Sequence, residues 1–353
     1  MFSSIKIGRF QINSNKAFIV AEMSANHNGS LKRALEILKA AKRSGANAIK
    51  LQTYQPETMT LNCRKKDFLL NFLKKNSFWK KYKNYYEIFK KGATPLEWHK
   101  RLFKEAKKIG LIIFSTPFDE SAVDFLEKLN CCAYKIASPE INHLPLLIKV
   151  AKTKKPVILS TGLADEKDID LAINTLKKYG NNKIILLKCS TAYPAIDKDA
   201  NLRNIIYLKE KYKLNVGYSD HTIDNTSALV AISLGAPLIE KHINLNDNIK
   251  TLDSFFSLKE KKFKEFVTQI RAAEAILGKK KYYLPKSSRD NYVARRSIYI
   301  AKDIIKGEKI DKNNIKIIRP GHGLHPKYYN YVLNKRAKKN LFFGDRLKRN
   351  NLI

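Results

Sequence analysis

A (β/α)8 barrel followed by a small, mostly β C-terminal domain is the fold that this 353-residue sequence predicts. Eight short, apolar, β-branched segments alternate with amphipathic helical segments over about 260 residues, the usual size of a closed barrel of eight βα units. The strand-like segments are apolar throughout, as expected for parallel strands that are covered on both faces. After Leu277-Gly278 the alternation stops and the composition changes.

The expected elements follow one another in regular order. Strands are expected at 18–22, 47–52, 111–116, 132–138, 156–161, 183–190, 215–219 and 237–242. Helices are expected at 30–44, from 95 onward, and at 119–129, 145–153, 165–178, 200–211, 224–234 and 258–277. Ser44-Gly45 is a helix-stop signal, and Thr94-Pro95 predicts a helix capped by Thr94 with proline at its first position. A doubly wound open sheet is the alternative, but no G-x-G-x-x-G follows a strand to support a dinucleotide site.

The segment 55–93 interrupts this order after the second strand. It is rich in Lys, Phe and Tyr, and its periodicity assigns it no role. We interpret the aromatic residues of 68–89 as packing or oligomer contacts rather than as a platform for stacking nucleic-acid bases.

The change after Gly278 divides the chain. We expect a barrel domain over 1–278, a linker over 279–292 and a small β domain over 293–353. The last of these contains short strand-like runs, turn signals at Lys306-Gly307 and Gly344-Asp345, and the block RPGHG at 319–323.

The formal net charge is +36, from 68 Lys and Arg against 32 Asp and Glu. Such a charge raises the possibility of a nucleic-acid-binding protein. The basic residues are mostly lysines scattered along helix faces, and no zinc finger, RNP motif or basic recognition helix is present. We therefore expect a solvated basic surface, which would also attract an anionic small substrate, and no nucleic-acid partner.

Membrane insertion and secretion are not expected. No apolar run approaches the roughly 18 residues of a membrane-spanning helix, and the first 22 residues do not resemble a cleavable leader. The four cysteines show no C-x-x-C spacing, which is typical of reduced thiols and predicts a cytoplasmic protein.

Polar side chains occur at the C-terminal end of one expected strand after another, which is where barrel enzymes place their active sites. Because an unpaired buried charge destabilises a fold, a role in the structure alone does not explain charged and hydroxyl residues at the same position of every strand. A role in function does. The series comprises Glu22, Lys50, Gln52, Ser115, Thr116, Lys135, Ser138, Glu140, Ser160, Thr161, Lys188, Ser190, Thr191, Tyr193, Ser219, Asp220, His221, Glu240 and His242.

These residue types suggest a chemistry. His221 and His242 follow neighbouring strands and could both reach one divalent ion, for which imidazole suits Mn, Fe, Zn or Co. Lys50 and Lys135, with nearby hydroxyls, form a pocket suited to a phosphate or a phosphate plus a carboxylate. Glu22 is a candidate general acid or base.

Nine stretches in order resemble the sialic acid synthase family, which condenses phosphoenolpyruvate with an N-acetylated amino sugar. They are AEMSANHNGSL (21–31), AIKLQTYQPETMTL (48–61), IFSTPFD (113–119), AYKIAS (133–138), ILSTGL (158–163), LLKCSTAYP (186–194), GYSDHT (217–222), EKHI (240–243) and IIRPGHGLHP (317–326). The C-terminal part is similar to the antifreeze-like (SAF) domain of this family. KLQTY, LDSFFSL (252–258) and RPGHGLHP most resemble the pseudaminic acid synthase branch, and Leu51 stands where the N-acetylneuraminate branch carries a histidine.

The resemblance implies roles for individual residues. His221 and His242 match the metal ligands, usually for Mn²⁺, with Mg²⁺ and Co²⁺ as alternatives. Residues that match catalytic groups or substrate contacts are Glu22 for proton handling, Lys50, Lys135, Ser138, Ser160 and Ser219 around phosphoenolpyruvate, and Gln52, Tyr193 and Asp253 facing the sugar. Thr116, Glu140 and Thr191 are further candidates for binding substrate. Thr191 stands where some members have asparagine.

The resemblance also implies an assembly and a reaction. Arg319 matches an arginine that reaches the sugar in the barrel of the partner subunit, which implies a domain-swapped homodimer. The implied reaction joins phosphoenolpyruvate to 2,4-diacetamido-2,4,6-trideoxy-altrose, releases phosphate by C–O cleavage and gives pseudaminic acid, a nine-carbon 2-keto-3-deoxy sugar acid. N-acetylneuraminate synthase, legionaminic acid synthase and another phosphoenolpyruvate-dependent aldose-condensing synthase are the alternatives at this stage.

Overall fold

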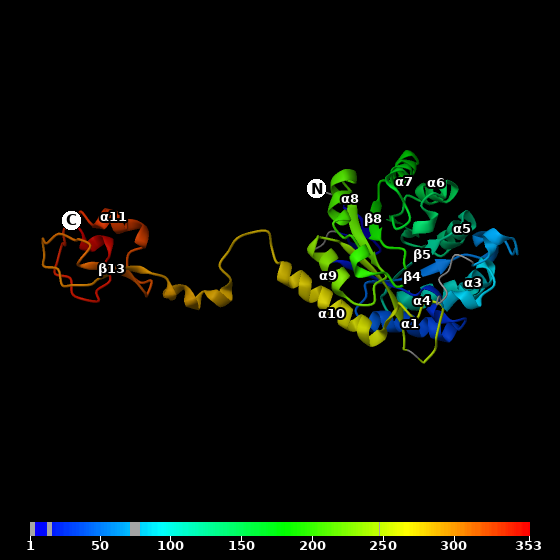
Figure 1. The fold of residues 1–353 in the computed structure, drawn as a ribbon, viewed down its shortest axis with the longest axis horizontal. Coiled ribbons are helices and arrows are strands. Elements are labelled where there is room, and N and C mark those ends of the chain that lie inside the picture. Colours follow the sequence, from blue (N-terminus) through cyan, green and yellow to red (C-terminus); the bar gives the residue numbers. More distant parts are fainter. Residues whose placement is uncertain (1–3, 13–15, 71–77, 247) are drawn as a thin grey trace. The chain divides into compact units, whose positions relative to one another are not determined.

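The computed structural model describes residues 4–12, 16–70, 78–246 and 248–353, and all structural statements below concern these residues. The chain forms two compact units, Met1–Gly278 and Lys279–Ile353, which are described separately (Figure 1).

The first unit is a closed barrel of eight parallel strands, as the sequence predicts. The strands are β3 (Phe18–Glu22), β4 (Ala48–Thr53), β5 (Ile112–Pro117), β6 (Tyr134–Ile136), β7 (Val157–Ser160), β8 (Ile184–Cys189), β9 (Asn215–Asp220) and β10 (Leu238–Asn244). Each strand pairs with the next, and β10 pairs with both β9 and β3, which closes the barrel. A further short strand, β11 (Leu258–Lys259), pairs in parallel with the C-terminal end of β10.

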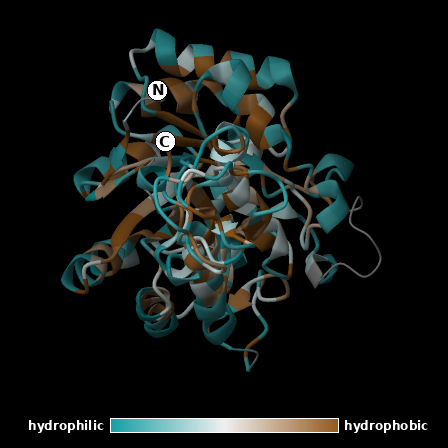
Figure 2. Ribbon diagram, turned by 90° about the vertical axis from the view of Figure 1, so that its left-hand side faces the viewer, coloured by the Kyte–Doolittle hydropathy of each residue, from teal (hydrophilic) through white to brown (hydrophobic). Residues whose placement is uncertain are grey.

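Helices separate the strands and surround them. They are α1 (Leu31–Arg43), α4 (Leu96–Lys108), α5 (Glu120–Lys128), α6 (Leu144–Lys152), α7 (Glu166–Lys178), α8 (Asn204–Tyr212), α9 (Thr226–Ser233) and α10 (Glu260–Leu277). Figure 2 shows teal and brown residues alternating along these helices, because one face of each helix packs on the barrel and the other faces solvent.

Two helix starts differ from the sequence prediction. The cap of α4 is Pro95 rather than Thr94, because the Thr94 hydroxyl lies 3.2 Å from Nε2 of the buried His27 and does not bond the helix. Helix α8 begins at Asn204 rather than near 200, because Asn201 has a φ of +40°, which an α-helix does not accommodate.

A hairpin that the sequence did not predict precedes the barrel. Strands β1 (Lys6–Ile7) and β2 (Phe10–Gln11) are antiparallel, and the neighbouring Ile5 and Ile12 are buried in the barrel core together with Ile7. Strands of two residues are too short to show an alternating pattern, so periodicity alone could not find them.

The segment 55–93 lies beside the C-terminal end of the barrel between β4 and α4. Its described part contains α2 (Pro56–Met59), two 3-10 helices (Lys66–Phe68 and Phe78–Lys81) and α3 (Tyr85–Gly92). Residues 71–77, which include part of the aromatic stretch considered above, lie outside the described residues.

The second unit has its own small core. Strands β12 (Ser297–Ile300) and β13 (Ile315–Ile318) are antiparallel, isolated β-bridges link the loops around them, and one short helix, α11 (Tyr329–Val332), packs nearby. The core consists of Ile298, Ile300, Ile304, Ile310, Ile315, Val332, Ala337, Leu341 and Leu347. This matches the expected small, mostly β domain.

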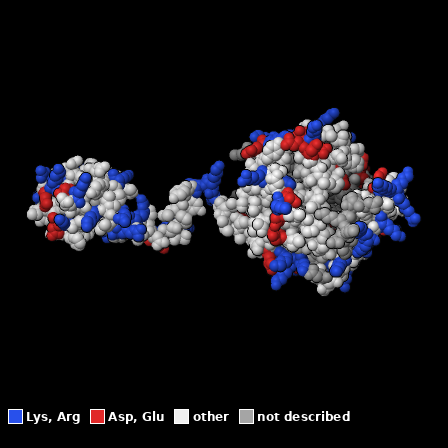
Figure 3. Space-filling view, in the orientation of Figure 1, with Lys and Arg blue, Asp and Glu red and all other residues white. Residues whose placement is uncertain are grey.

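Basic side chains are distributed over the surface. Figure 3 shows several separate groups of Lys and Arg on the visible face, with acidic residues between them, rather than one continuous basic patch. No helix in the described ranges has the length and apolarity needed to cross a membrane. Cys63, Cys131, Cys132 and Cys189 are all free thiols.

Candidate active site

A cavity of about 330 Å³ opens at the C-terminal ends of the barrel strands. It brings together most of the residues that the sequence singled out. These are Glu22, Lys50, Gln52, Lys135, Ser138, Glu140, Ser160, Tyr193, Ser219, His221, His242 and Asp253. Their convergence follows from strand register, since Glu22 is the direct partner of both Lys50 and His242 in the parallel pairing.

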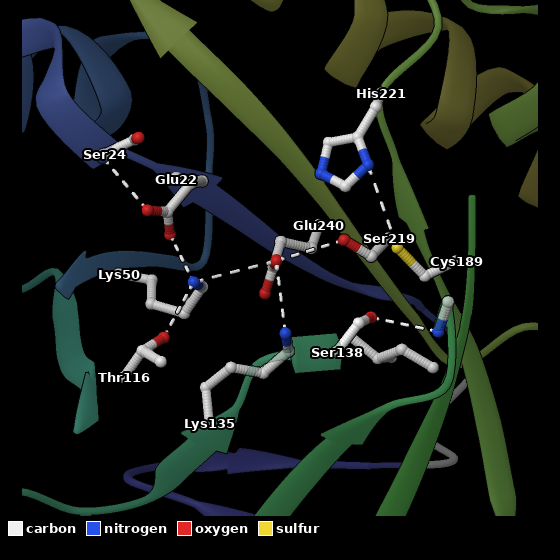
Figure 4. A network of polar contacts seen from close by, with 12 residues as sticks. Glu22, Ser24, Lys50, Thr116, Lys135, Ser138, Cys189, Ser219, His221 and Glu240 are labelled. Carbon is white, nitrogen blue, oxygen red and sulfur yellow. Dashed lines mark hydrogen bonds and ion pairs between the residues drawn. The ribbon is translucent and has the colours of Figure 1, made fainter. Parts of the chain in front are cut away.

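Four charged side chains form the floor of the cavity (Figure 4). Lys50 Nζ lies 2.6 Å from Glu22 Oε2 and 3.7 Å from Glu240 Oε1, and Lys135 Nζ lies 3.7 Å from the same Glu240 oxygen. All four side chains are at most 4% exposed. Two cations and two carboxylates therefore share a site from which bulk water is excluded.

Burial and mutual attraction shift the pKa values of this group in different directions. Burial raises the pKa of Glu22 and lowers the pKa of Lys135. Burial acts in the same sense on Glu240 and Lys50, but the charges of the opposite sign outweigh it, so the pKa of Glu240 falls and that of Lys50 rises. The floor thus favours an ionised Glu240 beside a cationic Lys50, and a Glu22 that takes up a proton more readily than an exposed glutamate.

Hydroxyl groups surround the charged floor. Thr116 does not line the cavity but accepts a hydrogen bond from Lys50 Nζ at 3.0 Å, and so positions that cation. Ser219 Oγ donates to Glu240 at 3.1 Å, and Ser138 Oγ accepts from the backbone N–H of Gly162 at 3.0 Å. Ser160 Oγ is buried without a protein partner, which is unusual for a buried hydroxyl and points to a ligand atom.

Thr191 also lies beside this group without lining the cavity. Its Oγ1 is buried and has no protein partner, and it occupies the space next to Gly162 together with Ser138 Oγ and Cys189 Sγ. A Cβ at Gly162 would lie only 2.3 Å from Thr191 Oγ1, so glycine is needed for this close approach.

The two histidines lie next to each other, with ring centroids 5.2 Å apart. His221 Nδ1 is 3.0 Å from the carbonyl oxygen of Ser190; because that oxygen only accepts, Nδ1 carries a proton, and in the neutral ring Nε2 then keeps its lone pair. His242 Nδ1 is buried and has no protein partner. An imidazole that donates one N–H to a carbonyl and leaves its other nitrogen available is the usual arrangement of a metal ligand.

The pair fits a metal site with few protein ligands. Within the described part of the chain, no three His, Cys, Asp or Glu side chains are grouped as a complete ligand set. Two imidazoles would therefore leave most coordination positions to oxygen atoms of substrate or water.

Asp253 is joined to Glu22 through Ser24, and Gln52 contacts Glu22 directly. Asp253 Oδ2 accepts hydrogen bonds from the Ser24 hydroxyl and, at 3.2 Å, from the backbone N–H of Ala25. The Ser24 N–H donates to Glu22 Oε1 at 3.0 Å, and Gln52 Nε2 donates to the same oxygen at 3.2 Å. Ser24 has a φ of +49°, a strained conformation for a residue with a side chain, and it is this conformation that joins the two carboxylates.

Several lining residues were missed as site residues by the sequence analysis. Glu240 was noted as a polar residue at a strand end, and its two-residue spacing from His242 places both on one face of β10, a signal that could have assigned it to the site. Ser24, Cys189 and Phe256 carry no comparable sequence signal, since their position depends on loop geometry and packing.

Arg319 lies apart from this group in the chain. It is an exposed residue of the second unit, directly after β13, and the first unit alone forms the cavity described here. Its role toward the sugar stays a prediction.

Glu140 gives the site a measurable pH dependence. Burial raises the pKa of its carboxyl to about 7, and its Oε2 has no protein hydrogen-bond partner. Because the Glu140 carboxyl binds its proton more tightly in the folded protein than in the unfolded chain, protonation stabilises the fold. This stabilisation is complete below the pKa of glutamate in the unfolded chain and is lost as the pH rises through 7. Between pH 5 and pH 8 we expect the native protein to lose about 1–3 kcal/mol of unfolding free energy that a Glu140→Gln variant retains. Urea unfolding of both proteins at several pH values measures this, and parallel pH profiles would contradict it.

Known proteins share this architecture over nearly the whole chain. A NeuB family model matches residues 37–282, and a SAF domain model matches residues 295–352. Pseudaminic acid synthase of Campylobacter jejuni subsp. jejuni serotype O:23/36 is 44% identical over 98% of each chain, and that of Helicobacter pylori is 45% identical over 91% of this chain and 93% of its own. The crystal structure of an N-acetylneuraminic acid synthetase from Leptospira borgpetersenii in complex with citrate superposes with a TM-score of 0.71 at 31% identity, covering 82% of this chain and 95% of that one. This chain therefore belongs to the NeuB family.

Proposed function

We propose that the chain is a pseudaminic acid synthase, a transferase of carbohydrate biosynthesis that condenses phosphoenolpyruvate with 2,4-diacetamido-2,4,6-trideoxy-altrose. The observation that carries this proposal is the buried pair Lys50 and Lys135 at the floor of the barrel cavity. It occurs in a chain that is 44–45% identical to pseudaminic acid synthases over almost its full length.

In this proposal Lys50 and Lys135 bind the phosphate and carboxylate groups of phosphoenolpyruvate. Buried ammonium groups with no bulk water nearby attract such an anion far more strongly than surface lysines do. Ser138 and Ser160 supply hydroxyl donors around it, Ser219 lines the same cavity while donating to Glu240, and the partnerless Ser160 Oγ supports a ligand at this position. Thr116 holds Lys50 in place, and Thr191 and Glu140 complete the surroundings of the anion.

The proposed reaction forms one C–C bond and breaks one C–O bond. C3 of phosphoenolpyruvate attacks C1 of the open-chain sugar, the electron pair of that carbonyl moves to its oxygen, and water adds to C2 of the former phosphoenolpyruvate. Phosphate then leaves with the C2–O electron pair, which gives the 2-keto-3-deoxy acid. One proton of the water ends on the new C4 hydroxyl and the other leaves with phosphate, so atoms and charges balance.

Glu22 is the residue that we assign to moving these protons. Burial raises the pKa of its carboxyl, so that Oε2 can hold a proton in one step and release it in the next. Its other oxygen, Oε1, accepts hydrogen bonds from Ser24 and Gln52, which fixes the orientation of the carboxyl group. Holding both substrates against this group lowers the entropic cost of the reaction.

His221 Nε2 and His242 Nδ1 would hold a divalent metal ion, which we expect to be Mn²⁺, with Mg²⁺ or Co²⁺ as alternatives. When bound, such an ion polarises the sugar aldehyde as a Lewis acid. Ser190 keeps His221 in the tautomer that leaves Nε2 available, so this chain's own backbone prepares the ligand.

The sugar would lie against Gln52, Tyr193 and Asp253 and be reached by Arg319 of the partner subunit in a domain-swapped homodimer. Apolar side chains on the linker and the second unit support a partner, because one protomer leaves them exposed. They are Tyr282, Tyr283, Leu284, Phe342 and Phe343. The four free thiols support action in the reducing cytoplasm.

Phosphate release from phosphoenolpyruvate tests the function. We expect turnover with Mn²⁺ and the trideoxy-altrose, loss of turnover when the metal is chelated, and much slower turnover with N-acetylmannosamine or 2,4-diacetamido-2,4,6-trideoxymannose. Faster turnover with one of the latter sugars would assign the chain to N-acetylneuraminate or legionaminic acid synthesis instead. No phosphate release with any of the three would contradict the proposed activity.

A further inference from the structure

The outer wall of the cavity is apolar, and the segment 55–93 builds much of it. The described residues that this segment contributes to the cavity are aliphatic, aromatic or glycine: Met59, Leu70, Trp79, Tyr85, Ile88, Phe89 and Gly92. Tyr54, Phe118, Leu252 and Phe256 continue the same wall from neighbouring loops. The charged floor comes from the barrel strands, so the cavity has two chemically different halves of different origin.

The segment is highly basic, yet the cations in its described part do not line the cavity. The described ones, Arg64, Lys65, Lys66, Lys80, Lys81, Lys83, Lys90 and Lys91, are all exposed, and none of them lines the cavity. A wall built to bind the anionic substrate would turn some of these charges inward. The wall therefore faces a part of the second substrate that carries no charge.

Two polar groups of the wall already donate hydrogen bonds to backbone carbonyl oxygens. The Tyr54 hydroxyl donates to the carbonyl oxygen of Phe89 at 3.3 Å, and the indole Nε1 of Trp79 donates to that of Leu252 at 3.0 Å. A sugar hydroxyl placed against these rings would give up water without gaining either of these donors as a partner.

The wall is also held in a defined position. The Tyr54 ring packs edge-on against Phe89 and Phe118, with centroids 6.0 and 5.2 Å away. A Cβ at Gly92 would lie 3.0 Å from the Tyr54 hydroxyl and 3.2 Å from Leu252, so the end of the segment fits closely against the barrel. A fixed apolar surface discriminates better than a mobile one, because it cannot rearrange to admit water.

We propose that this wall is the subsite for the C6 methyl group of a 6-deoxy sugar, and that it selects such sugars against their 6-hydroxy counterparts. The proposal rests on the function proposed above and adds to it the residues that read position 6. The C6 methyl replaces water on an apolar surface, whereas a 6-hydroxyl loses its hydration there. An apolar pocket of this kind rejects an added hydroxyl by a factor of about 10–100.

Two sugars that differ only at C6 test the proposal: 2,4-diacetamido-2,4,6-trideoxy-altrose and the same diacetamido sugar with a 6-hydroxyl. We expect the native protein to favour the first by about 10–100-fold in kcat/KM. Ile88→Thr, which replaces the ethyl branch of the side chain with a hydroxyl, is expected to reduce that ratio by about 5–10-fold with the KM for phosphoenolpyruvate unchanged. Leu70→Asn serves as a second variant of similar shape in case Ile88→Thr does not fold.

The matched control is Ile206→Thr, the same substitution at an exposed position of α8 on the outside of the barrel. It should leave the ratio unchanged. Equal kcat/KM for the two sugars in the native protein would overturn the wall's role while leaving the proposed function intact. The same conclusion would follow if Ile88→Thr and Leu70→Asn both kept the native ratio of kcat/KM between the two sugars.

A measurement of sugar binding distinguishes a failure of the wall proposal from a failure of the proposed function. The chain has two tryptophans, one of which, Trp79, lies in the wall, so its fluorescence reports sugar binding without turnover. If neither sugar releases phosphate but the 6-deoxy sugar still binds more tightly, with a preference that Ile88→Thr removes, the wall is correct and the reaction is not. Equal binding of both sugars would overturn the wall in that case too.

Discussion

Replacing Lys135 by methionine is expected to lower kcat/KM for phosphoenolpyruvate by roughly 10³-fold, about 4 kcal/mol of transition-state stabilisation. Lys135 is buried at the cavity floor, 3.7 Å from Glu240, and methionine keeps an unbranched apolar stem of nearly the same length while removing the ammonium group. An anion that approaches the floor would then meet Glu240 with one cation fewer to offset it. Steady-state phosphate release with phosphoenolpyruvate as the varied substrate measures the effect.

A second lysine serves as the control for this substitution. Lys155 is partly buried and pairs with Glu127 at 2.6 Å, but it precedes β7 and so lies at the opposite end of the barrel from the cavity. Lys155→Met removes a similar ion pair and should leave kcat/KM within about twofold, because surface pairs of this kind contribute little. If the two variants lost activity equally, the effect of Lys135→Met would reflect stability rather than binding of the anion.

The sequence predicts the barrel well because strand and helix periodicities differ and repeat eight times. The polar residues at the strand ends were identified for the same reason: Glu22, Lys50 and Lys135 each follow an apolar run, and the closed barrel necessarily brings such strand ends together. What periodicity could predict is therefore the floor of the cavity.

The wall could not be predicted in this way. Trp79 and Phe89 belong to a segment without a repeating pattern, and their sequence context of lysines and aromatics is equally consistent with a surface or an interface. Our interpretation of the aromatic residues as packing or oligomer contacts was incomplete, since Tyr85 and Phe89 also line the cavity. The positions of these aromatic residues depend on contacts between residues far apart in the chain, such as the hydrogen bond from Trp79 to Leu252, which local sequence patterns do not reveal.

The link through Ser24 was missed for a related reason. Its φ of +49° and its hydrogen bonds to Glu22 and Asp253 connect residues that are 231 positions apart, from Glu22 to Asp253. Serine is not a residue that signals positive φ in a sequence, as glycine or asparagine would. The orientation of the proposed proton-transfer group thus depends on a backbone conformation that only the folded barrel stabilises.

A heterodimer of Lys135→Met and Arg319→Ala protomers is expected to regain about half of the native activity, although each variant alone is nearly inactive. In a domain-swapped dimer, each site combines the barrel of one protomer with Arg319 of the other. One site of the mixed dimer then carries both substitutions, and the other carries neither. Co-expression with two different affinity tags and sequential purification isolates the mixed dimer, and phosphate release measures its activity.

The control for this experiment pairs Lys135→Met with Glu22→Gln. Both substitutions lie in the barrel, so every site of that mixed dimer contains one defect and no activity should return. If Arg319 served the barrel of its own chain, the first mixed dimer would be as inactive as this control, and if the chain did not dimerise, no doubly tagged species would be recovered. Recovery of activity in the first pair alone would therefore assign Arg319 to the partner's cavity, because only an exchange of the second unit between protomers leaves one complete site.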